Sequence, residues 1–231
     1  MVLRMTSKRV KDAVDELRPP TDVVLSRTFW QDVRNGNEAE RLEHILSQLE
    51  KMASRTHITR LVLQSGDYSA KPRDCGMTRQ DAERLAGVLV QCSGLFLLEL
   101  GINQIGDEGL GRLADVLSGC SVLSKLNLSR NQIGDEGAGR LAEVLPQCPA
   151  LSMLILGCNR IGPDGAGRLA GVLSQCQALD YLDLNDNQIG DEGTGRLAGV
   201  LPQCPNLRVL CLDKNRIANE GARLLAEVLP Q

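Results

Sequence analysis

The sequence predicts an α/β solenoid, a stack of similar units that each add one strand to a parallel sheet and one helix to an outer layer. The motif NQIGDEG occurs at 103–109, 131–137 and 187–193, with the variants NRIGPDG at 159–165 and NRIANEG at 215–221. The asparagines that begin these motifs recur every 28 residues. A period of about 20 to 50 residues is typical of stacked repeat units.

Each unit contains a leucine pattern followed by a helical pattern. In the second unit Leu126 and Leu128 flank Asn127, which is the alternation expected of a strand with one buried side. After GDEG, the apolar residues within 141–148 fall at helical spacing. Alignment on the asparagines divides this part of the chain into units at 93–120, 121–148, 149–176, 177–204 and 205–231.

Stacking is expected to bend the array. A lone strand and helix of this size cannot bury enough apolar surface to fold, so neighbouring units must complete each other's core. Paired strands lie about 4.8 Å apart, whereas packed helices need about 8 to 10 Å. The strands are therefore expected on the concave side of the stack and the helices on the convex side.

The segment LSKLNLSRNQIGDEGAGRLAEVLPQC, at 123–148, resembles a leucine-rich repeat of the ribonuclease-inhibitor type. The resemblance covers about 56–231 and implies a right-handed horseshoe in which the asparagine side chain ties the turn backbone. It also implies that the concave sheet binds protein. The same repeats occur in enzyme inhibitors, in the sensor region of NOD-like immune receptors and in Ran GTPase-activating proteins, so the fold does not select one function.

Charge and hydropathy exclude two classes of partner. The net charge of -3 gives no reason to expect nucleic acid as a partner. The first residues, MVLRMTSKRVKDAVDEL, are charged throughout, and no stretch reaches the roughly 18 apolar residues of a membrane span. We expect neither a nucleic acid nor a membrane as partner, and a cytoplasmic location, with the nucleus as the alternative.

Five of the eight cysteines follow the repeat. Cys92, Cys120, Cys148, Cys176 and Cys204 stand 28 residues apart, each at the end of an apolar helical run. This position is typical of a small buried hydrophobe. A zinc site would need cysteine pairs at short spacing, and the sequence has none. All eight cysteines, including Cys75, Cys158 and Cys211 outside this column, are expected to be reduced.

The phrase GDEGAG at 134–139 is superficially similar to a phosphate-binding loop. Asp135 and Glu136, however, already place negative charge at the positive end of the helix, and no lysine follows as a P-loop requires. A structural role accounts for every residue, with glycines in tight turns, an aspartate as helix cap and an acidic residue paired to an arginine one turn later. The predicted pairs are Glu108–Arg112, Glu136–Arg140, Asp164–Arg168 and Glu192–Arg196.

The sequence carries no motif of an enzyme, a metal site or a cofactor site. His44 and His57 lie in different segments without matching cysteine or aspartate spacing, so each is expected at a surface or an interface. We therefore predict a protein that is not an enzyme and that uses no cofactor and no metal.

The repeat is absent from residues 1–55, which are predicted to form an N-terminal helical cap. Segments 6–17 and 37–54 have helical patterns, the second with Asn37 as N-cap and an acidic residue three positions later. The segment DVVLS at 22–26 could form a short strand. Phe29 and Trp30 are expected to cover the core of the first unit. A separate effector domain is the alternative.

Residues 56–92 are predicted to be a first, atypical repeat, followed by five repeats at 93–231. The atypical repeat carries nine extra residues, within 66–77, that are expected to leave the rim of the concave face. Loops that leave a regular scaffold are often functional, and Tyr68, Lys71 and Arg73 are the candidate contact residues. A tolerated surface insertion is the equal alternative.

The last unit ends in GARLLAEVLPQ, one residue before the expected cysteine, and has no cap. This ending predicts a fragment of a longer array or a chain cut at a repeat boundary, with an engineered or recently duplicated array as the alternative. An apolar end of this kind predicts end-to-end self-association through the last repeat.

The units differ most at positions that point outward from the sheet. Their residues describe a basic patch, an apolar centre and an acidic patch, which suggests recognition of a partner protein. Simple drift of exposed positions is the alternative, and the scarcity of aromatic residues favours it, because tight interfaces usually centre on such residues. The candidate contact residues are Glu99, Lys125, Asn127, Arg130, Met153, Ile155, Tyr181, Asp183, Asp186, Cys211 and Asp213.

These observations together predict a non-catalytic protein-protein interaction scaffold that binds a partner, of unknown identity, through its concave sheet and rim loop. A GTPase-activating protein of the Ran type is one alternative, and GTP hydrolysis by a small GTPase with and without the protein would test it. The sensor fragment of a NOD-like immune receptor, with no ligand of its own, is the other.

Overall fold

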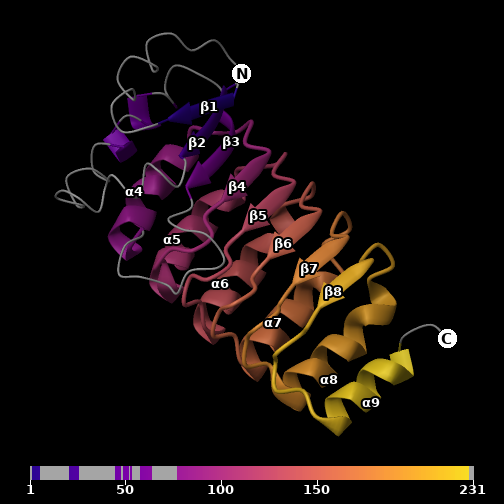
Figure 1. Cartoon of the computed structure of the whole chain (residues 1–231). Coiled ribbons are helices and arrows are strands. Elements are labelled where there is room, and N and C mark those ends of the chain that lie inside the picture. Colours follow the sequence, from indigo (N-terminus) through magenta and orange to yellow (C-terminus); the bar gives the residue numbers. More distant parts are fainter. Residues whose placement is uncertain are drawn as a thin grey trace.

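The computed structural model describes residues 2–5, 21–25, 45–47, 49–51, 53, 58–63 and 77–228. Within these residues, eight parallel strands form one sheet whose order follows the sequence (Figure 1). The strands are β1 (Val2–Met5), β2 (Thr21–Leu25), β3 (Ile58–Leu63), β4 (Leu97–Glu99), β5 (Lys125–Asn127), β6 (Met153–Ile155), β7 (Tyr181–Asp183) and β8 (Val209–Cys211).

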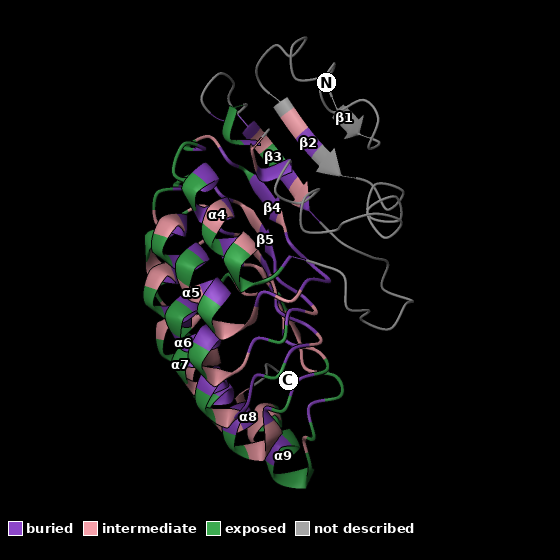
Figure 2. Ribbon diagram, turned by 90° about the vertical axis from the view of Figure 1, so that its left-hand side faces the viewer, coloured by how far each residue is buried: buried purple, intermediate pink, exposed green. Residues whose placement is uncertain are grey.

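A layer of helices covers the outer side of this sheet. The helices are α4 (Arg79–Leu89), α5 (Gly106–Leu117), α6 (Asp135–Val144), α7 (Pro163–Leu173), α8 (Gly190–Val200) and α9 (Asn219–Val228), with short 3-10 turns at Leu145–Gln147 and Leu201–Gln203. Figure 2 shows the helices on the convex side and the strands lining the concave side. The predicted α/β solenoid, with one strand and one helix in each unit, is confirmed.

Equivalent residues of successive units lie side by side in the sheet. From β4 to β8 each paired residue stands 28 positions from its partner, so that Leu98 pairs with Leu126 and Leu126 with Leu154. A position in the repeat therefore becomes a row of neighbouring side chains across the sheet. Rows that point inward build the core, and rows that point outward build the concave surface.

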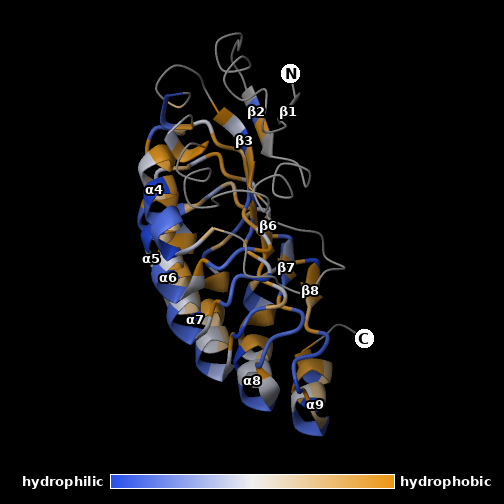
Figure 3. Ribbon diagram, turned by 60° about the vertical axis from the view of Figure 1, so that its left-hand side comes forward, coloured by the Kyte–Doolittle hydropathy of each residue, from blue (hydrophilic) through white to orange (hydrophobic). Residues whose placement is uncertain are grey.

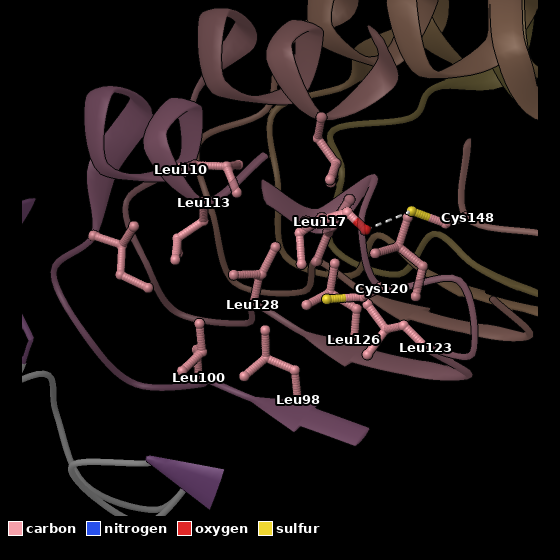
Figure 4. Close-up of a cluster of buried hydrophobic side chains, with 14 of the residues drawn as sticks. Leu98, Leu100, Leu110, Leu113, Leu117, Cys120, Leu123, Leu126, Leu128 and Cys148 are labelled. Atoms are coloured by element: carbon pink, nitrogen blue, oxygen red, sulfur yellow. Dashed lines mark hydrogen bonds between the residues drawn. The ribbon is translucent and has the colours of Figure 1, made fainter. Parts of the chain in front are cut away.

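The core lies between the sheet and the helices. Leu98, Leu126, Leu154 and Leu182 are at most 1% exposed, and they face the leucines on the inner sides of the helices. Figure 4 shows this packing in the first two regular units, where strand leucines meet Leu110, Leu113 and Leu117 of α5. Figure 3 shows hydrophobic residues along the strands and hydrophilic stretches on the helices.

The repeated asparagines form a buried ladder that links each unit to the one before it. The Asn159 Oδ1 accepts hydrogen bonds from the backbone N–H groups of Asn131 (2.9 Å) and Ile133 (3.1 Å). Its Nδ2 donates to the carbonyl oxygens of Leu128 (3.0 Å) and Leu156 (2.8 Å). Asn103, Asn131, Asn187 and Asn215 make similar bonds to the preceding unit. The ladder thus satisfies backbone groups that the strand and helix leave unpaired.

The aspartate of GDEG caps a helix, as the sequence indicates, but the capped helix belongs to the following unit. The Asp135 Oδ1 accepts hydrogen bonds from the N–H groups of Gly162 (2.7 Å) and Gly165 (2.8 Å), at the start of α7. Asp107 caps α6 through Gly134 N–H at 2.6 Å, and Asp191 caps α9 in the same manner. Each cap therefore also joins two units.

Two helices start differently because the preceding unit lacks this aspartate. Position 107 of the first regular unit corresponds to Arg79 in the atypical repeat and to Pro163 in the third unit. In the helices that follow, Gly106 and Gly190 adopt positive φ angles of 62° and 61°. Their N–H groups donate to the carbonyls of the ladder residues Asn131 (2.9 Å) and Asn215 (2.8 Å) instead. Glycine tolerates this left-handed backbone, which explains why these two starts remain unstrained.

Replacement of Asp135 by alanine is expected to lower the free energy of unfolding by about 1 to 2 kcal/mol, because two N–H groups of α7 lose their acceptor. Urea denaturation followed by circular dichroism measures the change. Glu136→Ala, at an exposed neighbouring position, is the control and should change stability by less than about 0.5 kcal/mol. Equal effects of the two substitutions would show that the inter-unit cap does not stabilise the array.

The cysteine column lies at the helix ends, as the sequence predicts. Cys92, Cys120 and Cys148 are buried, and the equivalent cysteines of the next two units are partly buried. Burial, reinforced by the neighbouring thiol of Cys120, raises the pKa of Cys92 and of Cys148 to about 11. Burial likewise raises the pKa of Cys176 to about 11. These thiols therefore stay protonated, and poorly nucleophilic, well above neutral pH.

The raised thiol pKa values predict a loss of stability at alkaline pH. An unfolded cysteine titrates near its ordinary pKa of 9.0, whereas Cys92, Cys148 and Cys176 retain their protons up to about pH 11 in the fold. The free energy of unfolding is therefore expected to fall as the pH rises from about 9 to 11, and to lose nothing through these thiols below pH 9.

Urea denaturation at pH 8 and at pH 10 tests this expectation. Cys148→Ala should reduce the difference between the two pH values, because one titrating thiol is removed. A wild-type protein that is equally stable at both pH values would contradict the prediction.

At the N-terminal end, the sheet extends beyond the repeats. The short strand suggested at 22–26 is present as β2, and β1, which the sequence did not predict, pairs with it in parallel. Helical residues at 45–47, 49–51 and 53 lie inside the expected segment 37–54, and Leu46 and Leu49 join the core. Phe29, Trp30, the segment 6–17, Asn37, His44 and His57 lie outside the described residues. The domain boundaries at 55 and 92 remain predictions.

At the other end, core leucines of the last unit are partly exposed. Leu210, Leu212 and Leu225 line a groove of about 420 Å³ together with Leu201 of the neighbouring unit. Self-association through this face remains a prediction, which light scattering at increasing concentration would test. None of the helices in the described part of the chain has the length and apolar character needed to cross a membrane.

Candidate partner-binding surface

The outward rows of β4 to β8 form the concave face, which is the candidate partner-binding surface. Strand pairing places equivalent side chains next to each other, because β4 to β8 pair without a change of register. The first row contains Leu97, Lys125, Met153, Tyr181 and Val209, and the second contains Glu99, Asn127, Ile155, Asp183 and Cys211. The predicted contact residues of these strands thus lie on one continuous surface.

The predicted basic patch is largely neutralised within the sheet. The Lys125 Nζ lies 2.8 Å from the Glu99 Oε1, and both side chains are mostly covered. One strand earlier, the Arg60 Nη1 lies 3.5 Å from the Asp22 Oδ2. The adjacent strand thus supplies a counter-ion to Lys125, and the role of Lys125 as a contact residue remains a prediction. The sequence did not reveal this pair, since its members stand in different units.

Asn127 offers little surface to a partner. It is 3% exposed, and its Oδ1 accepts hydrogen bonds from the N–H (3.0 Å) and the Oγ (2.8 Å) of Ser129. A residue that points away from the core can still be covered by its neighbours on a curved sheet. The prediction that Asn127 contacts a partner is thus not supported by its burial.

The centre of the concave face is apolar and half-buried. Met153 and Ile155 of β6 lie beside Tyr181 and Asp183 of β7. The Tyr181 Oη and the Cys211 Sγ share a hydrogen bond at 3.7 Å. The hydrogen bond with Cys211, followed by burial and by the negative charge of Asp183, raises the pKa of Tyr181 to about 12. The phenol is therefore neutral at physiological pH.

Carboxylates gather on the C-terminal side of this apolar centre. The Asp183 Oδ1 accepts a hydrogen bond from the Asn185 N–H at 2.9 Å, and the Asn185 Oδ1 accepts one from the Asp213 N–H at 2.9 Å. These bonds hold the backbone after β7 and β8 in place. Asp186 and Asp213 are exposed, so the predicted acidic patch is present at this end of the concave face.

In the turn after β6, the side chain of Cys158 lies near those of Asp186 and Arg130. The Cys158 Sγ donates to the Asp186 Oδ2 at 3.5 Å. Burial raises the pKa of Cys158, while the nearby Arg130 guanidinium opposes this shift. Arg130, the second residue of the predicted basic patch, is therefore close to the acidic side of the face and does not form a separate basic surface.

The backbone before each ladder asparagine is left-handed, which the sequence did not indicate. The residues are Ile102, Arg130, Cys158, Asp186 and Lys214, with φ angles between 53° and 60°. Such a conformation costs a residue with a side chain about 1 to 2 kcal/mol. The bend it produces turns the following asparagine into the core, where the ladder offsets the strain. No common residue type marks this position, so composition alone could not reveal it.

The helix side differs from the prediction in its ion pairs. The Arg196–Glu192 pair forms, with Nη2 and Oε1 2.6 Å apart. Arg140 instead bonds to Asp115 of the preceding unit at 2.9 Å and to Glu143. Glu108 pairs with Arg79. These exposed pairs contribute little to stability and mark a solvated face.

The described residues contain no group of three or more His, Cys, Asp or Glu side chains arranged to hold a metal ion. The segment with Tyr68, Lys71 and Arg73, as well as Cys75, lies outside the described residues. The rim loop therefore remains a prediction, and the concave face of β4 to β8 is the surface whose geometry is defined.

Comparison with known proteins agrees with the repeat. A family model described as leucine-rich repeat matches residues 97–114, 119–142, 175–198 and 203–226. Each match contains one whole strand, β4, β5, β7 or β8, and most of the helix that follows it. No curated protein sequence matches the chain.

Several solved structures are similar to this chain. Actin-binding site 2 of leiomodin-1 is 21% identical, with a TM-score of 0.47 over 53% of this chain and 71% of that one. The tropomodulin C-terminal domain of Caenorhabditis elegans is 17% identical, with a TM-score of 0.45 over 54% of this chain and 79% of that one. An internalin of Listeria monocytogenes is 20% identical, with a TM-score of 0.43 over 80% of this chain and 56% of that one.

The family matches fall on four of the five regular units of the solenoid, in which the leucine rows are buried up to the last unit and each asparagine joins the ladder. Period, strand-helix order and asparagine bonding are three separate features that agree with one repeat type. The chain therefore contains leucine-rich repeats, which the family model matches at four places within 97–226.

Proposed function

We propose that the chain is a non-catalytic scaffold that holds a partner protein on the concave face of β4 to β8. The rim segment 66–77, with Tyr68, Lys71 and Arg73, is part of the proposal as a second contact region. The helix side is solvated and carries paired surface charges, so it is not the proposed contact surface.

The contrast between two adjacent rows of the sheet carries this proposal. The inward row contains only leucine, at Leu98, Leu126, Leu154, Leu182 and Leu210. The outward row beside it contains Glu99, Asn127, Ile155, Asp183 and Cys211, five different residue types. Both rows occupy the same strands, so strand formation does not require the difference. Selection for contact with one asymmetric partner explains it.

A capture experiment with two matched variants tests the proposal. The concave variant replaces Met153, Tyr181 and Asp183 with alanine. The convex variant replaces the exposed residues Glu83, Arg112 and Glu136, on α4, α5 and α6, with alanine. Circular dichroism establishes that both variants are folded. Proteins captured from a cell lysate by each tagged form are then quantified by mass spectrometry.

We expect a set of captured proteins that the wild type and the convex variant share and that the concave variant loses. Purified members of this set should bind the wild type directly. An unchanged set with the concave variant would exclude the concave face as the interface.

A further inference from the structure

The carboxylates of the concave face differ in their pairing between the N-terminal and the C-terminal strands. On the N-terminal side each carboxylate has a cation from the adjacent strand, because Asp22 pairs with Arg60 at 3.5 Å and Glu99 with Lys125 at 2.8 Å. The sheet itself supplies the counter-ions there. A partner would find these strands nearly neutral.

On the C-terminal side the sheet supplies no such counter-ion. The register neighbours of Asp183 are Ile155 and Cys211, and neither carries a positive charge. Within the described residues, Asp183 and Asp213 form no ion pair, although Arg208 and Lys214 are exposed in the last unit. Asp186 is a different case, because it accepts a hydrogen bond from Cys158, a thiol that Arg130 also approaches.

An apolar, aromatic floor accompanies these two carboxylates. Tyr181 and Asp183 are two residues apart on β7, so their side chains leave the same face of the strand about 7 Å apart. Met153 is the register neighbour of Tyr181 on β6. A cationic side chain placed between Tyr181 and Asp183 could contact the face of the ring and the carboxylate together.

We propose that Tyr181, Asp183 and Asp213, with Met153 and Ile155 as the floor, bind a basic segment of the partner protein. This inference rests on the proposed function and names its partner's chemistry. The segment carries lysine or arginine for the two carboxylates and an apolar residue beside it for β6. Charge complementarity selects this occupant, because an acidic segment or a nucleic acid would place more negative charge against Asp183 and Asp213.

Synthetic peptides test the inference on the whole chain. Three fluorescein-labelled peptides of equal length share leucines and serines, and carry lysine, glutamine or glutamate at the same positions. Fluorescence anisotropy measures their binding, in low and in moderate salt. We expect the lysine peptide to bind, the other two to bind at least about tenfold more weakly, and added salt to weaken the lysine peptide.

Two charge-matched variants separate a local site from the net charge of the protein. Asp183→Asn with Asp213→Asn should weaken binding of the lysine peptide about tenfold or more, and the amide oxygen introduced at position 183 can still accept the Asn185 N–H bond. Glu83→Gln with Glu136→Gln removes the same charge from the helix side, and should change binding less than about twofold. Tyr181→Phe should bind as the wild type does, whereas Tyr181→Ala should bind more weakly.

Equal losses in the two charge-matched variants, or no preference for the lysine peptide, would overturn the inference. This outcome is distinct from failure of the proposed function. If the concave variant loses captured proteins while the peptides show no preference, the concave face binds protein through other chemistry. If captured proteins are also unchanged, the concave face is not the interface.

Discussion

Replacement of Asn159 by alanine is expected to lower the free energy of unfolding by roughly 3 to 5 kcal/mol, which would unfold part of the array at moderate temperature. The Asn159 side chain satisfies the N–H groups of Asn131 and Ile133 and the carbonyls of Leu128 and Leu156, all of them buried. Each buried polar group left without a partner costs about 1 to 3 kcal/mol. Alanine leaves the two N–H groups without an acceptor and removes the side chain that fills this part of the core. The carbonyls of Leu128 and Leu156 keep hydrogen bonds from Asn131 and Asn187, which limits the loss.

Urea denaturation measures this loss, and amide hydrogen exchange at residues 131 and 133 localises it. Asn206→Ala is the control within the same array, since the Asn206 Nδ2 makes a single bond, to the exposed Gln177 carbonyl at 2.8 Å. Its cost should stay below about 1 kcal/mol. A cost for Asn159→Ala as small as that of the control would show that the ladder is not needed to hold neighbouring units together.

The architecture could be predicted from sequence because its determinants recur within one short unit. The alternation of Leu126, Asn127 and Leu128 marks β5, and the same spacing marks the strands of the other four regular units. β1 could not be predicted in this way, because residues 2–5 lie outside the repeat and have no equivalent copies to compare. The left-handed backbone at Ile102 and its equivalents could not be predicted for another reason. The residue type at this position differs in every unit, and only the backbone conformation recurs.

The sequence indicated which positions of the strands point outward, but not which of their charges pair with each other. Pairing such as Lys125 with Glu99, or the cap from Asp135 to Gly162, joins residues 26 or 27 positions apart. A contact one or two positions short of the 28-residue period joins non-equivalent positions of neighbouring units, so an alignment of equivalent positions does not reveal it. The same holds for Pro163, which replaces the capping aspartate in the third unit. The consequence lies in the fourth unit, where Gly190 adopts a positive φ angle.

The second glycine of GDEG is required because neighbouring helices meet there. A methyl group at Gly165 would lie 2.6 Å from the Asp135 Oδ1 and 2.9 Å from the Asp135 Cα, on the preceding helix α6. Both distances are shorter than real contacts allow, and the backbone atom cannot rotate away. α7 would have to move off α6, with loss of the cap and of packing.

Gly165→Ala is therefore expected to lower the free energy of unfolding by roughly 2 to 3 kcal/mol. Gly171→Ala, in the same helix, is the matched control, because its added methyl group meets no atom within 4 Å. It should stabilise the protein by about 0.5 to 1 kcal/mol, since alanine favours the helix and restricts the unfolded chain. Both variants make the same chemical change, so the difference between them in urea denaturation isolates the helix contact. Similar stabilisation by both would mean that α7 can shift at no cost and that close helix approach does not restrict this position.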